Sequence, residues 1–386
     1  MQLRLVHRFG AAALACAVVS IPVSGRAQFL DLSVLEQSDA YVFQFFRDVD
    51  DVQVVTHSNA YSISFENQTD FRVQLTRQTV VVPAVDAPPG SEEAVDAITS
   101  ASRPLREVGD AFREYSRNRH EATLDLSRPR WNAGYYVSSE EDYFAQMFRA
   151  GLDRDLVGTT LNIAAGASYG WDSIQPLEDA DTDGVSDHRR TAYANVVTTW
   201  ILSPRTVLRA GLEHFRVDGL QHNPYRNVYV DGGNLPELHP DTRNRSDVYL
   251  RLHRYLAMRA SVKLLWKHYF DSWGVRSNTF GARLSQYVGD DVVVRYRYRY
   301  YRQSHADFFS EDYAEPGGID GYRTGDYRLG DFGAHLFGTR MSWSLGRVIA
   351  ERGSLRSLSL QLGYERYFNS NNFSANIFEA GIALDF

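Results

Sequence analysis

The sequence has almost no cysteine and almost no lysine. Cys16 is the single cysteine, and Lys263 and Lys267 are the only lysines. Because Cys16 lies in an N-terminal stretch that we expect to be removed, the rest of the chain has no thiol. This excludes disulfide bonds, thiolate metal sites and cysteine nucleophiles. No run of about 18 apolar residues follows that stretch, so any membrane-spanning segment must be a strand.

The first residues have the pattern of an export signal. Arg4 and Arg8 precede an apolar stretch at 9–19, and Gly25-Arg26-Ala27 provides a small-x-small cleavage site. The pattern predicts a signal peptide at 1–27 and a single barrel domain at 28–386. A lipoprotein signal ending at Cys16 is the alternative, which Ala13, standing where leucine is expected, disfavours.

The charge balance after the signal is acidic. The signal holds three of the 41 basic residues and no acid, so the remainder carries (41 − 3) − 48 = −10. This gives no support to nucleic-acid binding, which needs a basic surface. The chain also has 23 Tyr, 21 Phe and 28 Gly, which favours short amphipathic strands with aromatic girdles over a helical enzyme.

A period-two alternation recurs along the chain. Near the C-terminus, apolar residues at 378, 380, 382, 384 and 386 alternate with small or charged residues, and the terminal Phe386 resembles an outer-membrane assembly signal. Alternation places one set on each face of a strand, and in lipid only a closed sheet pairs every backbone amide. Similar segments lie at 52–65, 71–82, 119–127, 131–138, 143–152, 160–171, 191–202, 205–217, 248–256, 260–267, 280–285, 292–301, 329–345 and 357–364.

Adding the weaker stretch 41–47 makes the strand number even, as both termini on the periplasmic side require. We therefore expect an all-β, closed antiparallel transmembrane β-barrel of about 16 strands, with 14 as the alternative, in the outer membrane of a Gram-negative bacterium. Long connections at 83–118, 173–189, 218–245 and 303–328 are expected outside the cell. A soluble β-sandwich is the competing interpretation. The surrounding lipid and the barrel assembly machinery are the expected partners.

An acidic loop carries the only candidate metal site. Asp179, Asp181, Asp183 and Asp187, with an intervening glycine, have the spacing of a calcium-binding loop. Arg190 stands where such a loop has a bidentate glutamate, so a solvated acidic loop without metal remains the other interpretation.

Basic residues gather on one side of the predicted barrel. If tyrosine and valine in 292–301 face lipid, the inward set is Arg251, Lys263, Lys267, Arg283, Arg295, Arg297 and Arg299. Glu121 and Asp125 are expected to point inward on a distant strand. Such a charged lumen suits a water-filled pore that attracts anions. The alternative is a barrel plugged by side chains that pair with one another.

Three stretches resemble a bacterial outer-membrane family known as domain of unknown function 3570. They are His222 to Val230 (HNPYRNVYV), Tyr269 to Thr279 (YFDSWGVRSNT) and Val294 to Asp312 (VRYRYRYYRQSHADFFSED). The resemblance implies an exported outer-membrane barrel and supplies no catalytic residues. The association of its genes with flavin-transfer enzymes and small lipoproteins implies an envelope lipoprotein or redox partner.

These motifs also predict a shared surface outside the membrane. Asn223, Tyr225 and Arg226 lie in a rigid turn, and Asp271 to Gly274 form a tight turn with Trp273 as a boundary aromatic. His305 and Asp307 follow the arginine-rich strand. We expect the three loops to fold together into a lid or binding surface.

The sequence offers no reaction centre. Gly166-Ala167-Ser168-Tyr169-Gly170 matches a nucleophile elbow by letters, but it lies inside a predicted strand instead of a strand-to-helix turn. We therefore expect a channel or transporter for small polar or anionic solutes, with no enzymatic activity. A structural barrel that scaffolds a lipoprotein or redox complex is the alternative.

Overall fold

Sixteen strands of the chain form one closed antiparallel barrel. The computed structural model describes residues 33–49, 52–82, 115–176, 187–224, 226–230, 233–310, 313, 321–345 and 355–386. Consecutive barrel strands pair with one another, and β1 pairs with β18 to close the sheet. The predicted fold class and strand number are confirmed.

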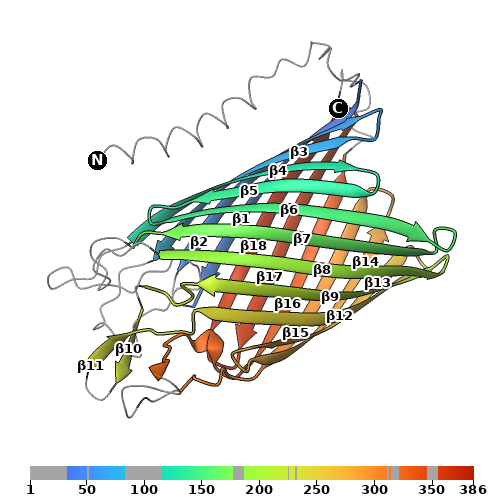
Figure 1. The fold of residues 1–386 in the computed structure, drawn as a ribbon. Coiled ribbons are helices and arrows are strands. Elements are labelled where there is room, and N and C mark those ends of the chain that lie inside the picture. The colour runs from blue at the N-terminus through green and yellow to red at the C-terminus, as the bar shows by residue number, and fades with distance from the viewer. Residues whose placement is uncertain are drawn as a thin grey trace, which may run out of the picture.

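The strands alternate in direction around the barrel (Figure 1). Eight run away from the end where β1 begins: β1 (Val34–Asp48), β3 (Asp70–Val82), β5 (Trp131–Ser139), β7 (Leu161–Ile174), β9 (Thr206–Gly219), β13 (Ala260–Asp271), β15 (Val292–Gln303) and β17 (Ser357–Asn369). Eight run back: β2 (Gln53–Phe65), β4 (Tyr115–Arg128), β6 (Tyr143–Leu156), β8 (Asp187–Ser203), β12 (Thr242–Leu256), β14 (Arg276–Val288), β16 (Phe332–Ser344) and β18 (Ser374–Asp385).

The two ends of the barrel differ in their connections. At the end where β1 begins and β18 ends, turns such as 157–160 and 257–259 are short, although the connection 345–356 is longer. We call this the short-turn end. The opposite, long-loop end carries the connections 83–114, 175–186, 220–241 and 304–331. The hairpin of β10 (Asn227–Val230) and β11 (Gly233–Pro236) extends beyond the long-loop end (Figure 1).

The two faces of the sheet differ in chemistry. Large apolar side chains such as Leu152, Phe280 and Leu362 are exposed on one face. On the other face, Arg297 of β15 reaches Glu365 of β17 across the intervening strand, at 2.9 Å. Side chains two strands apart converge only on the concave side of a closed sheet, so the polar face lines the lumen and the apolar face points outward. In the described ranges, no helix has the length and hydropathy needed to span a bilayer.

The outward face becomes basic within five residues of the long-loop end of the strands. Its histidines there are His57, His120, His188, His214, His268 and His335, six of the eleven in the chain. Its arginines there are Arg47, Arg77, Arg190, Arg216, Arg276, Arg302 and Arg366. We call this set the rim belt. Asp218 is the one outward acid at this level in the described strands.

Candidate functional site

The barrel register brings the predicted basic residues onto one stretch of the inner wall. Arg251 on β12, Lys263 and Lys267 on β13, Arg283 on β14 and the three arginines of β15 (Arg295, Arg297 and Arg299) all share the lumen-facing side. Arg209 of β9 and Arg340 of β16 extend this group to both sides. We call these nine residues the basic wall.

Within the basic wall, cations lie directly opposite one another. Lys263 pairs in register with Arg283, and Arg283 pairs in register with Arg297. Arg209 likewise lies opposite Arg251. Like charges directly opposite each other on neighbouring strands are destabilising. The sheet therefore carries a repulsion that an anion in the lumen would relieve.

Three cations of the basic wall have acidic partners. The Arg297–Glu365 pair spans Gly338, and Arg340 reaches Glu379 at 2.7 Å across Gly363. Each glycine lies in register between the two charged residues, so no side chain separates them. Lys267 pairs with Asp247 at 2.7 Å and with Glu213 at 3.5 Å.

The other cations of this wall remain without an acidic partner. No ion pair within the described ranges involves Arg209, Arg251, Lys263, Arg283, Arg295 or Arg299. Arg283, Arg295, Arg297 and Arg340 surround a cavity of about 330 Å³, to which Gln361 and Glu365 also contribute. Four guanidinium groups and one carboxylate around a single space favour a bound anion, because guanidinium forks bind carboxylate and phosphate oxygens.

The acids predicted on the far wall are neutralised locally. Glu121 forms an ion pair with Arg119 at 2.9 Å, and Asp125 forms one with Arg149 across Gly134. The sequence pattern placed both acids on the inward face, and the register agrees. Glu121 and Asp125 therefore have their own arginines and do not offset the six unpaired cations of the basic wall.

The second candidate region joins three connections at the long-loop end. The Trp273 ring packs edge-on against Phe308, with centroids 5.2 Å apart, and His239 lies 5.3 Å from Trp273. Val275, Ala306 and Leu329 complete this buried cluster. We use the name outer loop cluster for this apolar group together with the polar contacts of Arg226, Glu237, Thr324 and Asp326 next to it. Trp273 is buried here, so its predicted place at a lipid boundary is wrong.

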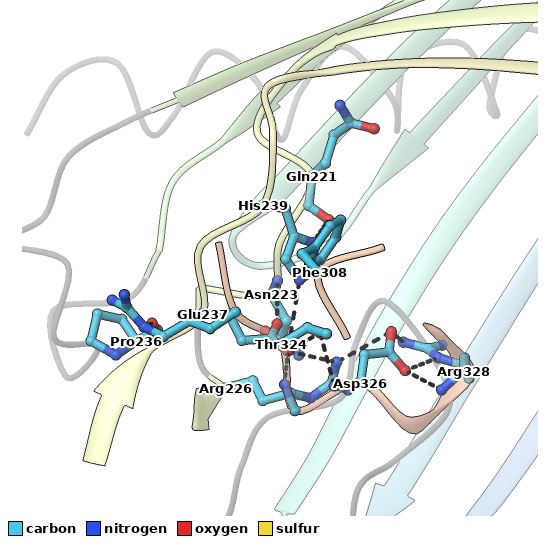
Figure 2. A network of polar contacts seen from close by, with 12 residues as sticks. Gln221, Asn223, Arg226, Pro236, Glu237, His239, Phe308, Thr324, Asp326 and Arg328 are labelled. Carbon is cyan, nitrogen blue, oxygen red and sulfur yellow. Dashed lines mark hydrogen bonds and ion pairs between the residues drawn. The ribbon is translucent and has the colours of Figure 1, made fainter. Parts of the chain in front are cut away.

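A buried carboxylate organises the polar half of the outer loop cluster (Figure 2). Glu237 accepts hydrogen bonds from the Thr324 hydroxyl at 2.9 Å and from the Gly325 amide at 2.8 Å. Arg226 lies 3.6 Å from Glu237 and 3.3 Å from Asp326. These contacts connect the loop 220–241 to the loop 304–331 through charges that are almost fully shielded from water.

Burial shifts the pKa values of this cluster. It raises the pKa of Glu237, against the opposing effect of the Arg226 guanidinium. It lowers the pKa of His239 to about 3, and the neighbouring His222 adds to the lowering. The pKa of Asp326 is lowered, because hydrogen bonding from Arg328 and the charge of Arg226 outweigh its burial. The cluster therefore holds His239 neutral and Asp326 ionised at neutral pH.

The predicted loop-surface residues take different positions. Asn223 and Arg226 both contact Glu237. The backbone amide of Asn223 donates to the Glu237 carboxylate at 3.2 Å, and the Arg226 guanidinium lies 3.6 Å from it. Asp271 caps its own turn by accepting from the amides of Trp273 at 2.9 Å and Val275 at 3.0 Å. Tyr225 lies outside the described residues.

The remaining two loop-surface residues lie at the edge of this cluster. The Asp307 amide donates to the Trp273 carbonyl at 2.8 Å, which fixes the two loops together. Its carboxylate lies so close over Gly274, where φ is +86°, that a β-carbon would overlap it. His305 instead forms an exposed pair with Asp331 at 2.8 Å, away from the buried network.

Sequence reasoning missed the centre of the outer loop cluster. Glu237 precedes Thr324 by 87 positions in the chain, and Asp326 lies two residues after Thr324. No spacing signal connects residues so distant. A single glutamate between Pro236 and Leu238, in a loop otherwise rich in turn residues, was the one local hint.

Most of the predicted calcium loop lies outside the residues that the structure describes. Asp179, Asp181 and Asp183 lie outside the described residues, and Asp187 is the first residue of β8. Among the described residues, no three His, Cys, Asp or Glu side chains gather into a metal-binding group.

Comparison with known proteins gives one family and several barrels. The family model described as "Protein of unknown function (DUF3570)" matches residues 11–376. No curated protein matches the sequence significantly. The solved structures include the loop L8 deletion mutant of OmpT, an outer membrane protein of Vibrio cholerae, with a TM-score of 0.45 and 8% identity over 92% of this chain and 99% of that one.

Two further solved structures come from Pseudomonas aeruginosa. OccK3 (OpdO) has a TM-score of 0.42 and 10% identity, over 91% of this chain and 95% of that chain. OccK2 (OpdF), solved in complex with glucuronate, has a TM-score of 0.42 and 11% identity, over 91% and 96% of the two chains.

Proposed function

The chain belongs to the DUF3570 family of proteins of unknown function, and we propose that it is an outer-membrane channel for small anionic solutes. The outward face supports the membrane location, because a closed barrel with exposed leucine, phenylalanine and tyrosine is stable only where hydrocarbon covers it. Bacterial outer membranes are the usual environment of such barrels.

Water access along the lumen supports a channel over a plugged barrel. In the lumen-facing ion pairs, Arg340 is 43% exposed, Arg149 is 41% exposed and Arg297 is 35% exposed. Side chains that filled the interior would bury one another. Arginines that pair yet keep a third or more of their surface accessible indicate space for water and solutes beside them.

The uncompensated basic wall is the observation that carries the choice of anions. It contains nine cations, and Glu365, Glu379 and the acids around Lys267 pair with three of them, which leaves six. On the far wall, Glu121 and Asp125 have their own arginines and so do not offset these six. Low-dielectric walls concentrate the field of the six free cations in the lumen and raise the local anion concentration.

Reversal potentials in planar bilayers test this proposal. With a potassium chloride gradient across the purified full chain, we expect anion selectivity. Lys263→Glu/Arg283→Glu reverses two free charges and should move the reversal potential toward cation selectivity. Arg254→Glu changes a single outward-facing charge near the short-turn end, and we expect this variant to keep the reversal potential of the parent chain.

Two results would contradict this proposal, the first its anion selectivity and the second the channel itself. Steady conductance with the same selectivity in the double variant would remove the role of the basic wall. Electrical silence of a preparation that remains folded would favour the alternative, a scaffolding barrel for a lipoprotein or redox partner. Folding is checked separately by the shift in gel mobility between unheated and heated samples.

A further inference from the structure

One sector of the rim belt concentrates cations on the outward face. It comprises Arg276 on β14, Arg302 on β15 and Arg366 on β17, with His268 on β13 and His335 on β16. Arg276 and Arg302 are exposed. The described outward positions of β13 to β17 include no acid, and none of the three arginines forms an ion pair there. Immediately before β16, the exposed Asp331 pairs with His305 at 2.8 Å, so the three arginines of this sector have no acidic partner among the described residues.

The sheet geometry leaves room for a headgroup in this sector. Arg302 lies opposite Asn278 on one side and Gly333 on the other. Arg276, two residues before Asn278, is the diagonal neighbour of Arg302. Such neighbours lie about 7 to 8 Å apart, a distance that long side chains can bridge. Gly333 has no side chain, and the Tyr300 hydroxyl lies 4.0 Å from where its β-carbon would be. Arg302 and the Tyr300 hydroxyl thus border the gap at Gly333, and Arg276 lies one strand further from it, on β14.

An apolar surface lies directly below this gap, toward the middle of the barrel. Tyr298 and Phe337 pack with centroids 4.8 Å apart, and His335 stacks on Phe368 at 5.2 Å. Tyr298 and Phe337 are exposed on the outward face. A ligand that fits both levels has an anionic head and hydrocarbon chains, which a free anion lacks.

The opposite rim of the barrel lacks this arrangement. Near the short-turn end, the outward-facing strand arginines are Arg128, Arg154 and Arg254, among leucine, valine and tryptophan side chains, and no histidine lies there in the described strands. Among the described strand residues, the outward face therefore carries seven arginines and six histidines at the long-loop end, against three arginines at the short-turn end. A leaflet of matching chemistry would carry more negative charge at the long-loop end.

We propose that the Arg276–Arg302 sector binds a phosphorylated lipid of the leaflet around the long-loop end, with its phosphate between the two guanidinium groups and its acyl chains on the Tyr298–Phe337 surface. Guanidinium groups favour phosphate because their paired N–H donors match its oxygens. The inference depends on the proposed membrane location and does not depend on channel activity.

Native mass spectrometry of the full chain released from detergent micelles tests the lipid site. The probe is a bisphosphorylated, acylated glucosamine disaccharide, and its dephosphorylated counterpart is the first control. We expect the phosphorylated lipid alone to remain bound. Arg276→Gln/Arg302→Gln should weaken its binding roughly tenfold or more. Arg154→Gln/Arg254→Gln removes the same charge from the opposite rim and should bind like the parent.

Several outcomes would overturn the lipid site. Equal retention of the dephosphorylated lipid by the parent chain would show that the phosphate is not recognised, and this comparison needs no variant to fold. Equal loss in both double variants would reduce the effect to net charge. Displacement by equimolar inorganic phosphate would assign the arginines to a free ion. Conductance, measured separately, distinguishes any of these results from a failure of the channel proposal.

Discussion

At Gly211 on β9, the absence of a side chain makes room for an aromatic ring on the next strand. Gly211 lies opposite Tyr249 of β12, and a β-carbon built on it would come within 2.6 Å of the Tyr249 hydroxyl oxygen and overlap the ring. Tyr249 is buried on the lumen side. The ring therefore covers the glycine backbone and contributes apolar contact that a larger residue at 211 would remove.

Gly211→Ala is expected to destabilise the barrel by about 1 to 2 kcal/mol, because an added methyl in a well-packed site forces the ring to move. Gly281→Ala is the matched control, since its β-carbon would lie 3.4 Å from the nearest atom, Leu265 Cβ, in ordinary contact. Urea unfolding in detergent micelles measures both. Equal midpoints for the two variants would show that Tyr249 does not depend on the glycine.

His239 is the residue through which pH should act on the outer loops. Its pKa is lowered to about 3 by burial and by His222, whose own pKa burial also lowers. An unfolded loop binds a proton near the ordinary value of about 6.5. Between these values the open loop binds more protons than the closed one, so closure is stable above about pH 6.5 and is lost progressively as pH falls.

We expect loop opening to increase on acidification by up to about tenfold per pH unit for each histidine. Glu237 acts in the opposite direction, because its raised pKa favours the protonated, closed form. Hydrogen exchange of the 220–241 amides between pH 7 and pH 5, corrected for intrinsic rates, measures the net effect. His239→Phe keeps a ring against Trp273 and should flatten the profile. A parent profile already flat would contradict this assignment.

The outer loop cluster is held as a unit by one cation between two acids. Arg226 is the guanidinium that faces both Glu237 and Asp326, and its side chain is 8% exposed. Removing one partner of a buried ion pair costs about 3 to 5 kcal/mol, since the remaining charge stays buried without compensation. The loop 220–241 should therefore separate from 304–331 when Arg226 is lost.

Arg226→Ala is expected to make both loops sensitive to protease while the barrel strands stay protected. Arg323→Ala is the control on the same loops, because Arg323 donates to backbone carbonyls, including that of Pro236 at 2.8 Å, and forms no ion pair with an acid in the part of the chain that the structure describes. Limited proteolysis with mass mapping of the fragments separates the two variants. Identical digestion patterns would mean that Arg226 does not hold the loops.

The strands could be predicted and the long-range pairs could not. All sixteen barrel strands appear where period-two alternation predicted them, although β1 begins at Val34, well before the predicted 41, because Glu36 to Ala40 lack an apolar alternation. Phase along each strand also placed Arg297 on the inward face. Its partner Glu365 lies two strands away, and only the register across Gly338 brings the two together.

The hairpin β10–β11 shows a different limit. The four residues Asn227–Val230 are too few to show a period, so the sequence indicates only a loop motif there, whereas the structure pairs them with Gly233–Pro236. The loop motifs suggested proximity of 223–226, 271–274 and 305–307. Glu237, which joins Asn223 and Arg226 to Thr324 and Gly325, is marked in the sequence only as a single glutamate in a turn-rich loop.

At the scale of the whole molecule, the barrel's asymmetry fixes an orientation that can be measured. The long-loop end carries the rim belt and the outer loop cluster, while both the start of β1 and the end of β18 lie at the short-turn end. A barrel inserted from the periplasm leaves its termini and short turns there. The rim belt would then face the outer leaflet, where the proposed phosphorylated lipid is required.

Single-cysteine labelling in intact cells tests this orientation, and the chain suits it because Cys16 is its only cysteine. Asn371→Cys lies in the exposed β17–β18 turn at the long-loop end, and Met258→Cys, at a position 82% exposed, lies in the β12–β13 turn at the opposite end. We expect a membrane-impermeant maleimide to label position 371 in intact cells and position 258 only after the outer membrane is permeabilised. Labelling of position 258 alone in intact cells would show that the barrel has the opposite orientation, with the Arg276–Arg302 sector facing the inner leaflet. Labelling of neither position in intact cells, with both labelled after permeabilisation, would argue against insertion in the outer membrane, because a soluble periplasmic chain is shielded from the reagent at both ends.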